Sequence, residues 1–197
     1  MSVDPATLAL VLVDMQNDFL HADGAYARGG AGAPAIAALP AKLVPVADAV
    51  RAAGGWLVST HFTLVPGRDG PFIAPHLKRL RPFLREGDFA PGSWGHAVID
   101  ELKPVDLKVE KVAYDAFYMS RLEFVLRRAG AETLVFGGIV TNGGVESTVR
   151  GAHVRDFHTI VLEDGCAAFG AAAHDAAIAS MRTMSDVTTC ADFVASL

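Results

Sequence analysis

One segment of this chain joins a strand, a glycine-containing turn and a helix, and it constrains the fold more than any other. Residues 134–140 form an apolar run of strand type, residues 141–144 are polar or glycine, and a helical pattern begins at Val145. A strand that turns directly into a helix is the unit from which parallel α/β sheets are built. Such sheets place their chemistry at the carboxyl ends of the strands, so this turn is a candidate active-site position.

The same alternation of strand and helix runs along the whole chain. The residue pattern predicts strands at 8–13, 56–60, 106–111, 134–140, 157–162 and 187–189, and helices at 40–53, 121–129, 145–155 and 174–183. Residues 65–96 are rich in proline and glycine and predict a long irregular excursion, which in a compact domain is usually functional. We expect one domain over residues 1–197, an α/β fold of three layers (αβα) with a mostly parallel six-stranded sheet and helices on both faces.

Composition excludes several functional classes. The 197 residues are 51% hydrophobic and 20% charged, as in an ordinary globular domain. The net charge of -5 is not that of a basic surface that binds nucleic acid. No apolar run approaches the roughly 20 residues of a membrane span. The apolar run at 8–13 has no basic segment before it, so we do not expect it to be a secretory signal. Cys166 and Cys190 form neither a disulfide framework nor a metal-binding pattern, as in proteins of the reducing cytoplasm. We therefore expect a cytoplasmic protein that binds neither nucleic acid nor membranes.

Asp14 is the first candidate catalytic residue. It directly follows the apolar strand at 8–13, where a side chain is placed to point into a ligand crevice. Partial burial there would raise the pKa of the carboxyl group and suit it to acid or base chemistry. The simpler alternative is a turn aspartate that caps the next segment.

Lys111 is the second candidate, because it ends the third predicted strand. An ammonium within a few ångströms of a carboxylate favours the ionised forms of both groups and supplies a charge for a developing anion. The alternative is an ordinary surface lysine, of which Lys103 and Lys108 are neighbouring examples.

Three separated motifs resemble those of the isochorismatase-like hydrolases, also called cysteine hydrolases. The first is a strand ending in Asp14-x-Gln16, followed by Asp18 and Phe19. The second begins at Lys111 and ends at Phe117, with Asp115 where the family usually has serine. The third is Thr141-Asn142, which the family follows with any residue, then the nucleophilic cysteine, then valine. Here Gly144 occupies the position of that cysteine.

The resemblance implies a Rossmann-like sheet topology and an active site without its thiol. In the usual family mechanism an aspartate, here Asp14, deprotonates the cysteine, whose thiolate attacks an amide carbonyl. Backbone N–H groups of the turn form the oxyanion hole, beside a cis peptide that would join Ile139 and Val140. We assign Ile139, Val140, Thr141, Asn142 and Gly143 to this turn, and expect Thr141 and Asn142 to brace it through hydrogen bonds from their side chains to the backbone. Family members are commonly dimers or tetramers, so we expect a homo-oligomer.

Further residues are candidates for contact with a small-molecule substrate: Gln16, Phe19, His61, Trp94, Tyr114, Phe117 and Tyr118. His61 ends the second predicted strand, and a structural histidine is nearly as good an interpretation. Nicotinamidase members of the family bind a metal through an Asp-x-His pattern, but the residue two before His61 is Ser59. We therefore expect no essential metal, and no cofactor.

Three functions remain open. The leading interpretation is a hydrolase of a small polar or carboxylated molecule that uses Asp14 and Lys111 without a covalent thioester, with vinyl ether hydrolysis of the isochorismate type as its sharpest form. The second is an amidohydrolase in which Asp14 activates water directly. The third is a binding protein that has kept the fold and lost catalysis. Cys166 is an alternative nucleophile, because it follows the strand next to the one that carries the turn, and Cys190 is better interpreted as a buried apolar residue.

Overall fold

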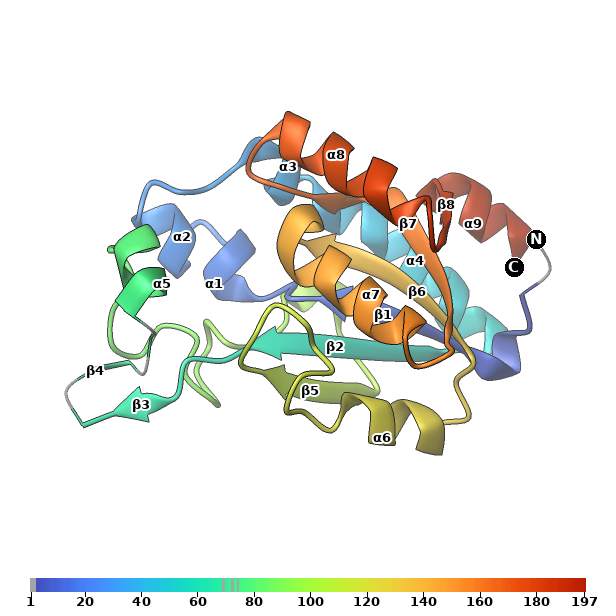
Figure 1. Cartoon of the computed structure of the whole chain (residues 1–197), viewed down its shortest axis with the longest axis horizontal. Helices are drawn as coiled ribbons and strands as arrows, with labels where there is room; N and C mark the ends of the chain where they lie inside the picture. The colour runs from blue at the N-terminus through green and yellow to red at the C-terminus, as the bar shows by residue number, and fades with distance from the viewer. Residues whose placement is uncertain (1–2, 69, 72, 74) are drawn as a thin grey trace.

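The computed structural model describes residues 3–68, 70, 71, 73 and 75–197 (Figure 1). Its main sheet has six strands, all parallel, in the order β5-β2-β1-β6-β7-β8. The strands are β1 (Leu8–Val13), β2 (Trp56–Phe62), β5 (Leu107–Lys111), β6 (Thr133–Ile139), β7 (His158–Ala167) and β8 (Asp186–Thr188). The predicted α/β class and six-stranded parallel sheet are therefore confirmed.

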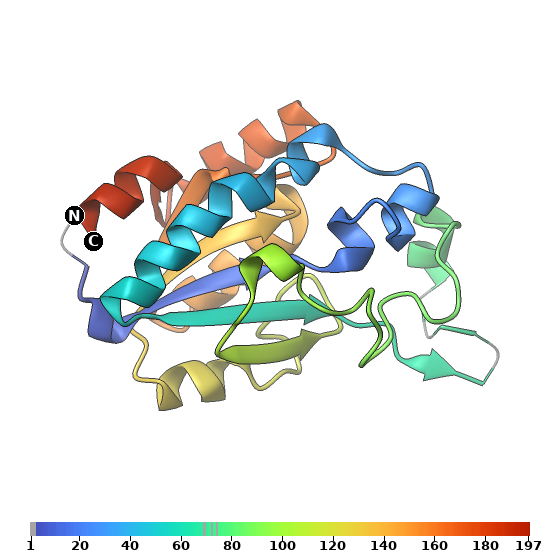
Figure 2. The same ribbon diagram turned by 180° about the vertical axis from the view of Figure 1, so that it is seen from behind.

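Every residue of β1 is buried, because this strand lies inside the sheet and both of its faces are covered by helices. Apolar side chains of α4 (Leu39–Ala53), α9 (Cys190–Ser196) and α3 (Pro34–Ala37) join the core on one face. Those of α6 (Leu122–Arg128), α7 (Glu146–His153) and α8 (Ala171–Met181) join the core on the other. Figure 2 shows α4 crossing its face of the sheet, with α9 beside it.

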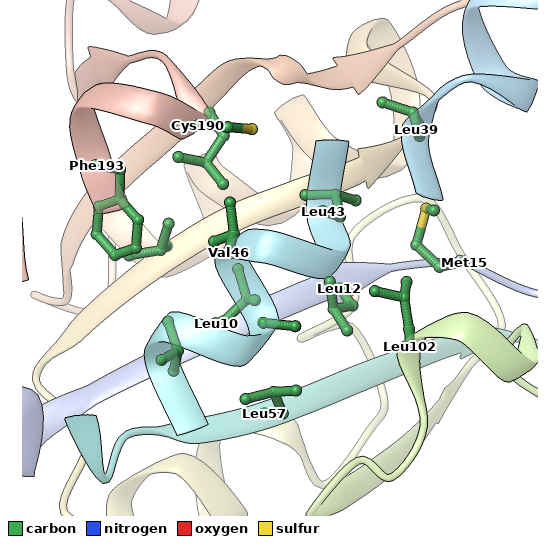
Figure 3. Packing of buried hydrophobic residues seen from close by; sticks show 14 of the residues in the cluster. Leu10, Leu12, Met15, Leu39, Leu43, Val46, Leu57, Leu102, Cys190 and Phe193 are labelled. Carbon is green, nitrogen blue, oxygen red and sulfur yellow. The ribbon is translucent and has the colours of Figure 1, made fainter. Parts of the chain in front are cut away.

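The helix predicted at 40–53 corresponds to α4, and its apolar stripe explains how it attaches to the sheet. Leu43 and Val46 are fully buried and belong to one cluster with Leu10 and Leu12 of β1 and Leu57 of β2 (Figure 3). Side chains spaced three or four residues apart lie on one face of a helix, so a single apolar stripe anchors its full length. Gly54 ends α4 in the left-handed conformation, with φ of 86°.

The irregular excursion contains more structure than its sequence predicts. It holds a short hairpin of β3 (Pro66–Gly67) and β4 (Gly70–Pro71), and then α5 (Pro75–Leu80). Together with α1 (Asn17–Leu20) and α2 (Ala25–Arg28) it lies beyond the carboxyl end of β2 (Figure 1). These helices are too short to show a helical period in the sequence, which is why the residue pattern did not predict them. Residues 69, 72 and 74 of the excursion lie outside the described part.

The boundaries of several predicted elements shift. The helix predicted from Val145 begins at Glu146 and follows a π-helical turn, Thr141–Val145. β7 extends to Ala167, beyond the predicted end at residue 162, and α8 begins at Ala171 instead of at His174. Among the described helices, none has the length and apolarity needed to cross a membrane.

Candidate active site

A buried ion pair joins the two predicted catalytic residues. Asp14 Oδ2 lies 2.7 Å from Lys111 Nζ, and the two side chains are 6% and 1% exposed. Thr60 Oγ1 donates a hydrogen bond of 3.2 Å to the other carboxylate oxygen of Asp14. The pair spans β2, which separates β1 from β5, and Lys111 Nζ passes 5.7 Å from the centre of the Phe62 ring of that strand. The structure therefore brings together two side chains 97 positions apart in the sequence (111 − 14).

Two opposing effects act on the Asp14 carboxyl group. Burial raises its pKa above the ordinary value, and the positive charge and hydrogen bond of Lys111, with a hydrogen bond from Thr60, act in the opposite direction. Burial is the largest effect, so the pKa is raised overall. A carboxylate with a raised pKa is a better proton acceptor, as a general base requires.

Asp14 has a φ of 55°, an unusual backbone conformation for a residue with a side chain. The strand beside it approaches closely: a Cβ atom at Gly138 would lie 2.2 Å from the Val13 carbonyl oxygen, and Gly138 has a φ of 126°. Only glycine suits such a position. This close approach brings the end of β6, and the turn that follows it, against the end of β1.

Gly144 faces Asp14 from this turn. A Cβ atom at position 144 would lie 3.3 Å from Asp14 Oδ2, 3.2 Å from Val13 Cγ1 and 2.8 Å from the Ile139 carbonyl oxygen. The cis peptide expected between Ile139 and Val140 is present. A π-helical turn, as found over Thr141–Val145, is a frequent feature of functional sites.

One expected residue, Thr141, and one unexpected residue, Thr148, hold the turn. Thr148 Oγ1 donates to the Gly144 carbonyl oxygen at 2.6 Å and accepts from the Ala116 N–H at 3.1 Å. Thr141 Oγ1 lies 2.8 Å from Nδ1 of His174, a side-chain partner instead of the expected backbone partner. Asn142 is exposed and its side chain forms no hydrogen bond with a described residue, so the bracing role expected of it is wrong. The sequence did not identify Thr148, although its position one helical turn after Gly144 was a usable signal.

A cavity of about 1230 Å³ opens in front of the ion pair. Six of the predicted residues line it: Asp14, Phe19, Lys111, Tyr114, Val140 and Gly144. The sequence did not identify the other aromatic residues of its lining (Tyr26, Phe62 and Phe169) or its two arginines (Arg68 and Arg81). The sequence carries no signal for these residues, because they come from five separate segments that only the fold brings together.

The structure places the other predicted substrate contacts away from the cavity lining. Gln16 is fully buried, and its amide bridges the Phe62 backbone and the His96 carbonyl oxygen. Phe117 is buried in the core and stacks on Phe157 at 6.0 Å between ring centres, while Trp94 and Tyr118 are 51% and 55% exposed. None of these four residues lines the cavity, and their role in substrate binding stays a prediction.

His61 has the surroundings of a structural histidine. Its ring is buried, and Nδ1 lies 2.8 Å from the His96 carbonyl oxygen. Nε2 has no hydrogen-bond partner among the described residues. Burial lowers the pKa of His61 to about 4, so the ring is neutral near neutral pH. His61 is not in the cavity lining, and the alternative of a structural histidine is the better interpretation.

Both cysteines are buried and belong to the apolar core. Cys166 Sγ lies 3.7 Å from the Phe136 carbonyl oxygen, and burial raises the pKa of this thiol far above its usual range. Burial also raises the pKa of Cys190 to about 12. A nucleophilic cysteine needs an accessible thiolate, and neither residue lines the cavity. Asp115 likewise faces away from it, accepting a hydrogen bond from the Phe117 N–H and lying against Gly151 of α7.

Within the described ranges, no three histidine, cysteine or acidic side chains are grouped as metal ligands. The expectations of no essential metal and no cofactor stay predictions.

Known proteins resemble this chain over nearly its whole length. Residues 8–192 match the Isochorismatase domain family. Ureidoacrylate amidohydrolase RutB of Methylobacterium radiotolerans is 34% identical over 196 residues, which cover 93% of this chain and 76% of that protein. The RutB protein of Caulobacter vibrioides strain CB 15 is 33% identical over 176 residues, covering 83% of this chain and 78% of the relative.

Solved structures show the same relationship. A cysteine hydrolase from Pseudomonas syringae pv. phaseolicola superposes with a TM-score of 0.84 at 25% identity, over 100% of this chain and 94% of that one. N-carbamoylsarcosine amidase from Thermoplasma acidophilum has a TM-score of 0.73 at 28% identity, over 93% and 96% of the two chains. The family match, the sequence relatives and the shared fold lead to one conclusion: this chain is a hydrolase that belongs to the isochorismatase family.

Proposed function

We propose that this protein hydrolyses a carbon–nitrogen bond of a ureido or amide compound, with a water molecule that Asp14 activates directly. The observation that carries the proposal is the approach of 3.3 Å between the Cβ position of residue 144 and Asp14 Oδ2. With glycine at 144, the space that a nucleophilic side chain would fill belongs to the cavity in front of the carboxylate. A water molecule placed there is within reach of its base.

The relatives favour this bond over a vinyl ether. Ureidoacrylate amidohydrolase and N-carbamoylsarcosine amidase are both named for compounds that carry a carbamoyl group on nitrogen. This makes the amidohydrolase, the second interpretation of the sequence, the better supported one. The terminal carbamoyl group of a ureide is the substrate chemistry that we carry over from these names.

The proposed reaction needs one proton carrier and one anion site. Asp14 takes a proton from water, the water oxygen bonds to the carbonyl carbon, and the proton passes to the leaving nitrogen as the C–N bond breaks. A ureide yields an amine and carbamic acid, which decomposes to ammonia and carbon dioxide. Lys111 keeps a positive charge 2.7 Å from Asp14 while negative charge develops on the carbonyl oxygen.

We assign the oxyanion hole to the turn at residues 139–144. The N–H groups of Gly143 and Val145 already donate to the Val140 carbonyl oxygen, at 2.9 and 3.2 Å. Val140 and Gly144 are the residues of this turn that line the cavity. Their backbone N–H groups are therefore the proposed donors to the carbonyl oxygen of the substrate.

The test is the release of ammonia from N-carbamoylglycine, N-carbamoyl-β-alanine and N-carbamoylsarcosine. We expect Asp14→Asn to lower the turnover by about 100-fold or more, as loss of a general base does. Cys166→Ala, treatment with iodoacetamide and the exposed matched control Asp23→Asn should each leave turnover unchanged. Equal turnover in Asp14→Asn, or loss in Cys166→Ala, would overturn the mechanism.

Vinyl ether hydrolysis is the alternative that the same pair of residues could perform. It requires Asp14 to be protonated and to act as the acid. The wild-type protein would then release pyruvate from isochorismate but no ammonia from any ureide, and Asp14→Asn would abolish the pyruvate release. That result would replace our proposal with this reaction. Binding without turnover of either class would favour a non-catalytic protein.

A further inference from the structure

Four aromatic rings form a continuous wall of the cavity. Phe62 lies 6.1 Å from Phe19, Phe19 lies 4.7 Å from Tyr26, and Tyr26 stacks on Phe169 at 5.5 Å between ring centres. All four line the cavity, together with aliphatic side chains such as Leu64 and Leu84. A surface of this kind binds the apolar body of a ligand, and a single carbamoyl group would leave most of it uncovered.

A cation lies at each end of this aromatic wall. At the Phe62 end, Lys111 Nζ is neutralised by Asp14. At the other end, Arg81 Nε donates to the Tyr26 hydroxyl at 3.2 Å, and its guanidinium carbon lies 6.0 Å from the centre of the Phe169 ring. The Phe62 end therefore has no net charge from this pair. Whether the other end is positively charged depends on whether a carboxylate pairs with Arg81.

Arg81 forms no ion pair with a carboxylate of the described residues. Its Nη1 donates to the Leu80 carbonyl oxygen, and no described group accepts from Nη2. Arg28 of the neighbouring α2 shows the contrast, because Asp88 Oδ1 neutralises it at 2.6 Å. Asp14 is the one carboxylate among the described lining residues, and it is already paired. Among the described residues, the Arg81 end of the cavity thus carries a net positive charge.

We propose that the ligand of this cavity is an elongated ureide or amide whose apolar body ends in a carboxylate held by Arg81. The assignment of a carbamoyl group to one end of the ligand rests on the proposed function. The assignment of a carboxylate to the other end is inferred from Arg81 and the aromatic wall alone. A planar guanidinium with free donors matches a carboxylate, and aromatic neighbours orient it. The aromatic wall places the apolar body between the two polar ends.

The test uses probes without a hydrolysable bond, so it does not depend on turnover. Calorimetric titration compares 4-phenylbutanoate with 4-phenylbutan-1-ol, which lacks the charge, and with butanoate, which lacks the ring. We expect the affinity for 4-phenylbutanoate to be about 10-fold higher than for either of the other two probes, or higher still, since each end of the probe adds its own interaction. Arg81→Gln should lower the affinity for 4-phenylbutanoate by about 10-fold and change the affinity for the alcohol by less than about twofold.

The matched control is Arg79→Gln, an exposed arginine of α5 two positions away, which should change neither affinity. Equal binding of the acid and the alcohol, or unchanged binding of the acid to Arg81→Gln, would overturn the proposal. Equal weakening of both probes in Arg81→Gln would also overturn it, because the residue would then act only through packing. If ammonia release fails even from a ureide that carries an apolar body and a terminal carboxylate, while the Arg81 effect holds, the proposed reaction is wrong and the binding assignment stands.

Discussion

Lys111 Nζ lies 2.7 Å from Asp14 Oδ2, although β2 separates the two strands that carry them. The lysine reaches the carboxylate past the Phe62 ring and also donates to the Ala113 carbonyl oxygen at 3.0 Å. Both side chains are almost fully buried, so each charge depends on the other for its stability. This pair is the centre of the proposed reaction and also a constraint on folding.

Removing one partner of the pair should cost more than removing both. We expect Lys111→Met to lower the free energy of unfolding by about 3–5 kcal/mol, because a buried carboxylate is left unpaired. The double variant Asp14→Asn, Lys111→Met should be more stable than Lys111→Met alone. Urea unfolding monitored by circular dichroism measures both. Lys103→Met, which breaks an exposed ion pair with Asp100, is the control and should leave the midpoint in place. Equal stability of Lys111→Met and the wild type would contradict the structural role of the pair.

The pH dependence of turnover should identify the working form of Asp14. Burial raises the pKa of its carboxyl group, and a general base works only when ionised. Ammonia release from a ureide should therefore fall as the pH is lowered, with an apparent pKa above that of a free aspartate. A general acid has the opposite sign, and its rate would fall as the pH rises. A kcat profile over a pH range in which circular dichroism shows an intact fold separates the two outcomes.

A thiol introduced at position 144 should be reactive where the native thiols are not. In Gly144→Cys the Cβ atom would lie 3.3 Å from Asp14 Oδ2 and beside the cavity, after a small adjustment near the Ile139 carbonyl oxygen. We expect iodoacetamide to label this residue in the folded protein and to leave Cys166 and Cys190 unlabelled, because both are buried. Peptide mass spectrometry gives the site. Gly144→Ser is the matched variant without a thiol, and labelling of Cys166 in folded Gly144→Ser would show that our account of its burial is wrong.

Gly138 and Gly130 should respond differently to the same substitution. Gly138→Ala combines a φ of 126° with a contact of 2.2 Å to the Val13 carbonyl oxygen, so we expect a loss of more than about 3 kcal/mol in the free energy of unfolding. Gly130→Ala has a φ of 71° and no heavy atom within 4 Å, and should cost about 1–2 kcal/mol. Chemical denaturation compares the two. Similar costs would show that the approach of β6 to β1 is less tight than the structure indicates.

His61 should make stability depend on pH in the mildly acidic range. Burial lowers its pKa to about 4 in the folded protein, against an ordinary value of 6.5, so the unfolded chain binds a proton more readily. The stability from this group is present above pH 6.5 and is lost as the pH falls towards 4, at up to about 1.4 kcal/mol per pH unit. His61→Gln should flatten this slope. His153→Gln, at an exposed histidine, should not, and equal slopes in all three proteins would contradict the burial of a neutral ring.

Parts of the site could be predicted from the sequence because they follow strands. Asp14 and Lys111 each end a run with a strand pattern, and the carboxyl ends of parallel strands lie along one edge of the sheet. The same reasoning suggested His61 as a substrate contact. That residue turns instead to the opposite face, where the His96 carbonyl oxygen fixes its ring. Side chains alternate along a strand, and a short apolar run does not show which face carries the site.

The amino-acid sequence by itself determined the order of the six strands of the main sheet and of α4, α6, α7 and α8, the two candidate catalytic residues, and the absence of a thiol at residue 144. These features are local, because periodicity and motif spacing are properties of neighbouring residues. Only the tertiary structure decided which residues form the cavity. Tyr26, Phe169 and Arg81 come from segments without a shared pattern, and they meet because the helices and the excursion pack over the same end of the sheet. Such contacts depend on the positions of whole elements in space, and no single segment of the sequence encodes them.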